Sequence, residues 1–108
     1  MFKILKWNIK QKFQKLTRGY SDEELWNLDT TFCEWIIPRL KTFKEKTIAY
    51  PPNLNNLEEW HSILQKMIVA FEMHNKDIPD TIEDIKKEDA IINEGIELFC
   101  KYFNHLWW

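Results

Sequence analysis

Residue types that recognise flat, anionic ligands recur along this chain of 108 residues. An arginine guanidinium offers a planar fork of donors to phosphate or carboxylate, and an aromatic face stacks on a base. In one hypothesis the arginines hold phosphates, the aromatic residues stack on a base and the acids bind its donors. The alternative is that the aromatic residues are core and the arginines are surface charges. The predicted ligand-binding residues are Arg18, Trp26, Asp29, Arg39, Tyr50, Trp60 and Glu72.

Catalytic and metal-binding patterns are weak by comparison. Glu58-x-x-His61 is the one metal-like spacing, and a di-iron bundle would need a second copy of it, so we interpret it as a solvated pair. His61, His74 and His105 have no nearby nucleophile with an orienting acid in sequence. The chain also lacks a phosphate-cradling glycine loop, G-x-S-x-G and H-E-x-x-H. We therefore expect no enzyme, no catalytic residue, no metal and no cofactor.

The distribution of charge says more than the net charge of −2 at pH 7. Residues 1–20 carry six lysines and arginines and no acid, whereas residues 77–97 carry eight acids and two lysines. The two ends could attract each other, or a basic face of one copy could meet an acidic face of another. The overall acidic balance argues against a stable nucleic-acid complex.

Apolar residues recur at helical spacing almost throughout the chain, and no strand-like alternation is evident. This pattern predicts an all-α bundle of about four helices with short loops, in a single domain covering residues 1–108. Pro38 lies within the second helix, which we expect to bend there rather than break, because its apolar stripe stays in phase. The expected helices are a basic N-terminal helix at 2–18, central helices at 22–47 and 57–75, and a C-terminal helix at 81–106.

Local signals define the helix ends. Gly19 ends the first helix, and Ser21 with Glu24 forms a capping box for the second. Asn56 followed three residues later by Glu59 repeats this signal after the loop AYPPNLNN, residues 49–56. Gly95 is expected to mark a close contact between helices. Cys33 and Cys100 lack metal-type or redox-type spacing, so we expect two free thiols.

The N-terminal helix has two interpretations. Its stripe of Phe2, Leu5, Ile9, Phe13 and Leu16 is what a bundle helix packs inward, with its lysines in solvent. A basic amphipathic helix with Trp7 as an anchor could instead lie on an anionic membrane or a nucleic acid. We favour packing and expect no membrane association. Two tryptophans at Trp107-Trp108 would expose much apolar area unless they dock in the bundle or on a neighbour, so a homo-oligomer is expected.

Three segments together resemble a family of small uncharacterised proteins of tailed bacteriophages: RGYSDEELWNLDTTFCEWIIPRLKTFKE, AYPPNL and EEWHSILQKMIVAFE. The resemblance spans residues 18–72 and implies a setting, the cytoplasm of an infected bacterial host, but no activity. From it we expect a non-catalytic phage protein that counters host defence by sequestering a small anionic, nucleotide-like signal. The alternative is a protein–protein adaptor or inhibitor that docks a host or virion protein through its basic helix or its tryptophan end.

Overall fold

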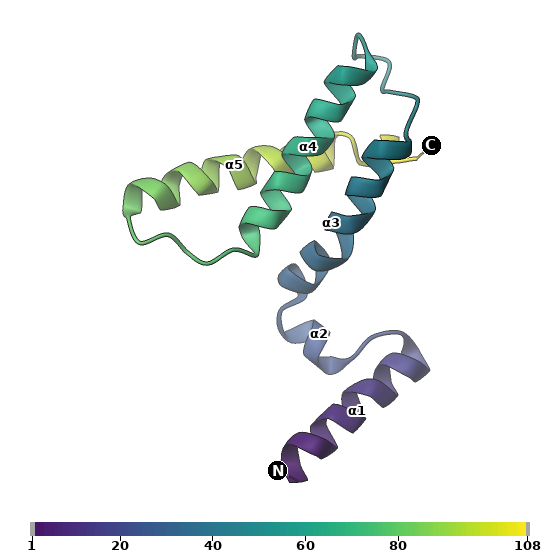
Figure 1. Cartoon of the computed structure of the whole chain (residues 1–108), viewed down its shortest axis with the longest axis vertical. Helices are drawn as coiled ribbons and strands as arrows, with labels where there is room; N and C mark the ends of the chain where they lie inside the picture. Colours follow the sequence, from purple (N-terminus) through teal and green to yellow (C-terminus); the bar gives the residue numbers. More distant parts are fainter. Residues whose placement is uncertain (1, 108) are drawn as a thin grey trace. The chain divides into compact units, whose positions relative to one another are not determined.

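The computed structural model describes residues 2–107 and consists of helices joined by short connections, with no strand in that range (Figure 1). The predicted all-α class is therefore confirmed. The elements are α1 (Phe2–Arg18), α2 (Asp22–Trp26), α3 (Leu28–Lys46), α4 (Leu57–His74), α5 (Ile82–Lys101) and the 3₁₀ helix η1 (Phe103–His105).

The expected long helix at 22–47 is interrupted, and this part of the prediction is wrong. The chain leaves helical geometry at Asn27 (φ −128°, ψ 60°), so that α2 has five residues and α3 begins at Leu28. The Asn27 carbonyl then accepts the amide of Thr31 at 2.9 Å and starts α3. Pro38 lies inside α3, which continues on both sides of it. The helix expected at 81–106 ends earlier, at Lys101, and is followed by η1.

The contacts divide the chain into two compact units, one ending at Phe32 and the other beginning at Cys33. We call them the N-terminal unit and the C-terminal unit. The N-terminal unit consists of α1, α2 and the start of α3, and the C-terminal unit contains the rest of α3, α4, α5 and η1. The single domain expected from the sequence is thus organised as two units, each of which is described by itself below.

Trp60 lies at the centre of the C-terminal unit, with 1% of its surface exposed. Its ring meets the ring of Phe43 edge-on from α3 (centroids 6.5 Å apart) and that of Tyr102 from the end of α5 (5.5 Å). Aromatic pairs in this arrangement contribute about 0.5–1.5 kcal/mol each beyond the apolar area that they bury. The buried cluster is Cys33, Leu40, Trp60, Leu64, Met67, Ile68, Phe71 and Tyr102.

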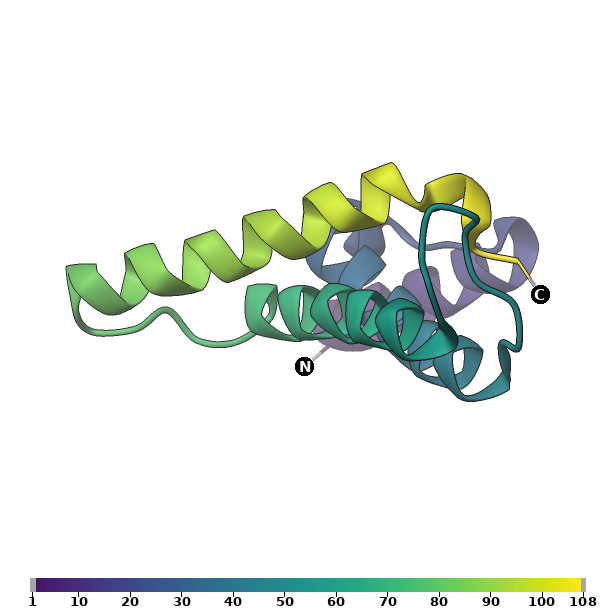
Figure 2. The same ribbon diagram turned by 90° about the horizontal axis from the view of Figure 1, so that it is seen from above.

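Helices α4 and α5 cross each other and pack closely where they meet (Figures 1 and 2). A Cβ atom on Gly95 would collide with the Cβ of Ala70 and lie 2.7 Å from the carbonyl oxygen of Lys66. The predicted close contact at Gly95 is therefore confirmed. Two small residues facing each other let the backbones approach, and the ion pair Lys66–Glu94 (2.9 Å) lies beside this contact on the surface.

None of the helices within residues 2–107 combines the length and the hydropathy that crossing a bilayer requires. Neither Cys33 nor Cys100 forms a disulfide, as expected, and Cys33 is buried whereas Cys100 is exposed.

We predict that Gly95→Ala lowers the free energy of unfolding of the C-terminal unit by about 1–3 kcal/mol, because the methyl group overpacks the contact with Ala70. Helix propensity alone would make Gly95→Ala stabilising, because alanine is about 1 kcal/mol more favourable than glycine in a helix. A loss of stability would therefore show that overpacking outweighs helix propensity. The measurement is urea denaturation followed by circular dichroism. Asn93→Ala, at an exposed position of α5, is the control and should shift the midpoint little. A Gly95→Ala midpoint equal to or above wild type would contradict the prediction.

Candidate functional site

In the N-terminal unit, two glutamines of α1 hold the first turn of α2. The side-chain oxygen of Gln11 accepts the backbone amide of Glu23 at 2.9 Å, and that of Gln14 accepts the amide of Asp22 at 2.9 Å. These amides are donors that a helix N-terminus leaves without a backbone acceptor. The predicted capping box is present, and the Ser21 amide donates to the Glu24 carboxylate at 2.6 Å. Gly19 makes the turn with a positive φ of 86°.

Arg18 is bound within this turn. Its Nη2 donates to the Asp22 carboxylate at 2.6 Å, its Nε donates to the Tyr20 carbonyl at 2.9 Å, and its guanidinium lies over the Tyr20 ring, 4.4 Å from the centroid. The Gln14 side-chain amide donates to the other Asp22 oxygen at 2.9 Å. A phosphate bound at Arg18 would lie close to the Asp22 carboxylate, whose negative charge would repel it. Arg18 therefore has a structural role in this turn, and its role as a phosphate ligand stays a prediction.

Trp26 and Asp29 also belong to the N-terminal unit. The ring of Trp26 stacks on that of Trp7 from α1, with centroids 4.8 Å apart and an interplanar angle of 25°. Trp7, considered above as a membrane anchor, therefore has a partner within its own unit. Asp29 lies in the first turn of α3, where a negative charge suits the helix dipole.

The apolar stripe of α1 lies outside the helix pair. Successive residues of an α-helix are separated by about 100°, so Trp7, Gln11 and Gln14, which contact α2, lie on the face opposite the stripe. The described members of that stripe are exposed, from 57% for Leu5 to 86% for Leu16. The side chain of Phe2 lies outside the described part. Among residues 3–32, Gln11 and Ser21 are buried and no apolar side chain is, so the expected inward packing of this stripe is absent from its own unit.

The C-terminal unit holds the other predicted ligand residues, and two of them serve its structure. Trp60 is a core residue with 1% of its surface exposed, so it offers no exposed face on which a base could stack. Glu72 on α4 is an exposed residue whose carboxylate accepts the ammonium group of Lys41 from α3 at 3.3 Å. This pair links the two helices at the surface.

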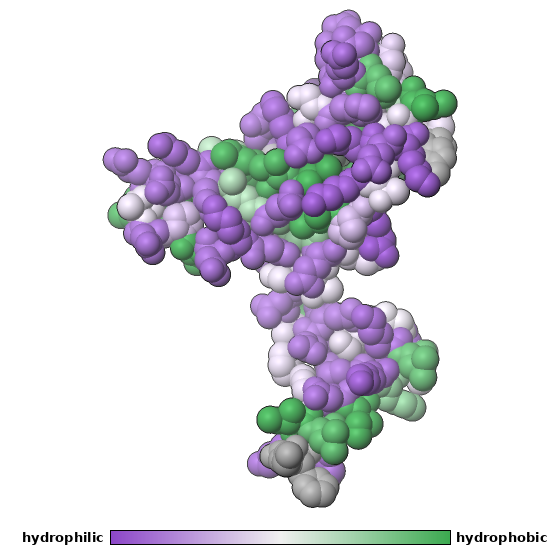
Figure 3. Space-filling view, in the orientation of Figure 1, coloured by the Kyte–Doolittle hydropathy of each residue, from purple (hydrophilic) through white to green (hydrophobic). Residues whose placement is uncertain are grey.

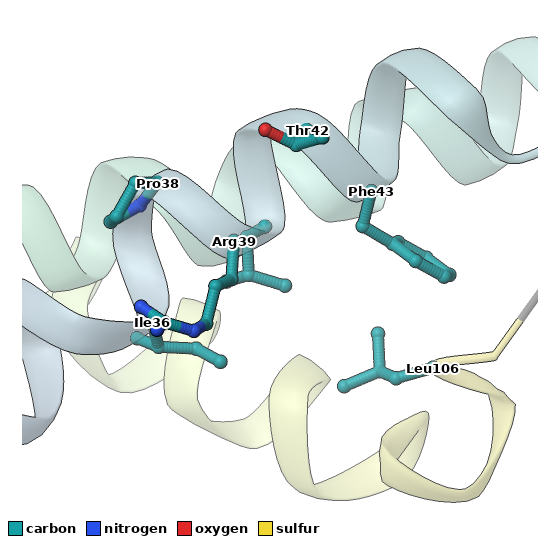
Figure 4. A pocket seen from close by; sticks show the side chains of 7 residues that line it. Ile36, Pro38, Arg39, Thr42, Phe43 and Leu106 are labelled. Carbon is teal, nitrogen blue, oxygen red and sulfur yellow. The ribbon is translucent and has the colours of Figure 1, made fainter.

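Arg39 and Tyr50 line two separate hollows of the C-terminal unit. The larger hollow, of about 560 Å³, is lined mainly by apolar side chains of α3 together with Leu106 (Figure 4). The smaller hollow, of about 310 Å³, lies between the loop at residues 49–56 and the residues after α5. Tyr50 and Trp107 line it. Trp107 is 70% exposed, so its expected docking in the bundle is not seen, and Trp108 lies outside the described residues.

Comparisons of this chain with protein-family models, curated proteins and solved structures found no match. The resemblance to phage proteins therefore stays a prediction. No group of three or more His, Cys, Asp and Glu side chains within residues 2–107 is placed to hold a metal ion.

The sequence interpretation missed the two glutamines and Trp35. Gln11, Gln14 and Arg18 recur at three- and four-residue steps opposite the apolar stripe, and this second, polar stripe was the available signal. Trp35 precedes Arg39 by four residues, a spacing that puts both on one helix face.

We predict that the pKa of the Asp22 carboxyl group lies below its ordinary value and rises when Gln14 is replaced by alanine. The hydrogen bond from Gln14 is the largest cause that lowers this pKa, followed by the hydrogen bond from Arg18. The carboxylate therefore stabilises the turn at pH values above its ordinary pKa, and this contribution is lost as the pH falls through the lowered pKa. The measurement is an NMR titration of the Asp22 carboxyl carbon. Gln65→Ala, in the other unit, should leave the titration unchanged, and an equal pKa in Gln14→Ala and wild type would contradict the assignment.

Proposed function

We infer that this chain is a non-catalytic binding protein and that α1 is the helix through which it docks a partner protein. The observation that supports this is the exposed stripe of Leu5, Ile9, Phe13 and Leu16 on the side of α1 away from α2. Figure 3 shows hydrophobic side chains gathered at the surface of the N-terminal unit.

The energetics of the N-terminal unit favour a covered stripe. Folded units below about 40 residues rarely bury enough apolar surface alone and usually need a disulfide, a metal or an oligomer. This unit ends at Phe32 and has no buried apolar side chain among those described. Full burial of one leucine, isoleucine or phenylalanine side chain contributes about 1.5–3 kcal/mol. Binding a partner would therefore stabilise this helix pair as well as the complex.

The charges beside the stripe indicate the chemistry of the partner. At about 100° per residue, Lys6 and Lys12 fall on opposite sides of the stripe, and neither forms an ion pair with another described residue. An amphipathic helix binds in an apolar groove through side chains spaced three and four residues apart. The partner that fits best is a protein with an apolar groove rimmed by acidic side chains. The predicted resemblance to phage proteins supports a host or virion protein as this partner, with the chain acting as an adaptor or inhibitor.

Sequestration of a nucleotide-like anion stays a prediction with less support. It relied on seven residues, of which Trp60 is core, while Arg18 and Glu72 are engaged by Asp22 and Lys41. The oligomer expected from the sequence likewise stays a prediction. In such an oligomer a second copy of the chain would supply the groove.

The test places a photo-crosslinking amino acid at position 13 in the full chain, expressed in a bacterial host. We predict one stoichiometric protein adduct, because Phe13 lies in the middle of the stripe and would contact the groove. The matched control carries the crosslinker at Lys10, an exposed position on the side of α1 that faces Asp22. The partner identified from the adduct is then purified, and its binding to wild type and to Ile9→Asp is measured by calorimetry. The Ile9→Asp substitution should weaken the affinity about a hundredfold or more, because the complex would bury the aspartate charge in an apolar groove.

Each outcome decides the proposal. An adduct from position 13 but not position 10, together with the affinity loss in Ile9→Asp, supports it. Adducts with lipid would indicate a membrane surface instead. Adducts with twice the mass of the chain would indicate that a second copy supplies the groove. No adduct, or full affinity in Ile9→Asp, would remove α1 as the docking element.

A further inference from the structure

The larger hollow of the C-terminal unit has an apolar wall and one cation. Its lining residues are Ile36, Pro38, Arg39, Leu40, Thr42, Phe43 and Leu106. Figure 4 shows Leu106, from the segment after η1, facing Phe43 on α3 across the opening, with Arg39 and Ile36 on the same stretch of helix. The volume of about 560 Å³ lies within the range of small-molecule sites, about 300–1,000 Å³.

The guanidinium of Arg39 is held in place without being neutralised. Its Nη1 donates to the carbonyl of Trp35 at 2.7 Å, and its central carbon lies over the Trp35 ring, 4.2 Å from the centroid. No carboxylate within residues 2–107 pairs with Arg39, in contrast to Arg18. Stacking on tryptophan restricts the side chain, so less conformational freedom would be lost when a ligand accepts its remaining donors.

The balance of charge and apolar surface selects the class of ligand. A phosphate carries two charges near neutral pH and is usually held by several donors, whereas this hollow offers a single arginine and Thr42 as polar groups. A carboxylate carries one charge and matches the two-pronged guanidinium fork. The aliphatic and aromatic wall suits an alkyl or aryl body.

We propose that this hollow binds a small carboxylate with an apolar body, its carboxylate on Arg39 and its apolar part between Phe43 and Leu106. The site belongs entirely to the C-terminal unit and is independent of the docking role of α1. It retains Arg39 from the predicted ligand residues and changes the ligand from a nucleotide to an amphipathic monoanion.

The experiment titrates the full chain with octanoate, with its neutral analogue octanamide and with AMP, followed by NMR of the methyl groups. Octanoate should shift the methyl signals of Ile36 and Leu106 with a saturable curve. Arg39→Gln should raise its dissociation constant about tenfold or more, the typical loss for a hydrogen bond to a charged group. Lys41→Gln is the matched control. It also removes one positive charge from α3, two residues after Arg39, but the Lys41 side chain does not line the hollow. The methyl groups of Leu16 report on the exposed stripe of α1 in the same spectra.

The proposal stands if octanoate binds at Ile36 and Leu106, octanamide binds at least tenfold more weakly, and Arg39→Gln but not Lys41→Gln reproduces that loss. The urea midpoint of Arg39→Gln should equal that of wild type, since Arg39 is an exposed residue. Equal affinities of octanoate and octanamide would overturn it. The proposal would also be overturned if the Leu16 methyl signals shifted with the same dissociation constant for octanoate, because this would indicate non-specific association. Saturable binding of AMP in place of octanoate would overturn it as well. These readouts do not depend on whether α1 docks a protein.

Discussion

The architecture of the N-terminal unit depends on two glutamine side chains that accept backbone amides of α2. Gln11 and Gln14 accept donors that the five-residue helix α2 cannot satisfy itself, so the face of α1 turned toward α2 is polar apart from Trp7, which stacks on Trp26. The arrangement is not fully compensated, because the Nε2 atom of Gln11 is buried without a hydrogen-bond partner among the described residues. A buried donor left unpaired costs about 1–3 kcal/mol. The opposite face of α1, which carries its apolar residues, is consequently directed away from its own helix partner.

The C-terminal unit is built by the opposite rule. Its helices turn their apolar faces inward onto Trp60, and polar bonds tie the connections to this core: the Asn56 side chain accepts the Glu59 amide at 2.8 Å, and Asn53 donates to the Tyr102 hydroxyl at 3.0 Å. The hydrogen bond from Asn53 links the loop at residues 49–56 to Tyr102, the residue that packs edge-on against Trp60. One unit thus has a core of its own and the other does not. A chain of this kind can present a helix to a partner while the C-terminal unit remains folded.

Periodicity and caps predicted much of the fold from the sequence, because helix geometry is a local property. The ends of α1 and α4, the cap at Asn56 and the contact at Gly95 were all within reach of spacing and residue type. The break at Asn27 was not, since Leu25 and Leu28 keep the apolar stripe in phase across it. Burial also escaped prediction. A stripe shows which face of a helix is apolar but not whether anything covers it. The stripe of α1 is exposed, whereas α4 carries the core residue Trp60.

The two arginines show how far local sequence could have corrected the predicted site. Arg18 has Asp22 four residues ahead, a spacing that puts a carboxylate on the guanidinium, and the 2.6 Å ion pair follows from it. Arg39 has Trp35 four residues before it and Phe43 four residues after it, so its neighbours on α3 are aromatic and cannot neutralise its charge. Residue type alone ranked the two arginines equally as ligand-binding residues. The neighbours at i ± 4 separate them: an arginine beside an acid holds a turn together, and an arginine on an aromatic ring beside an apolar hollow keeps donors available for an anion.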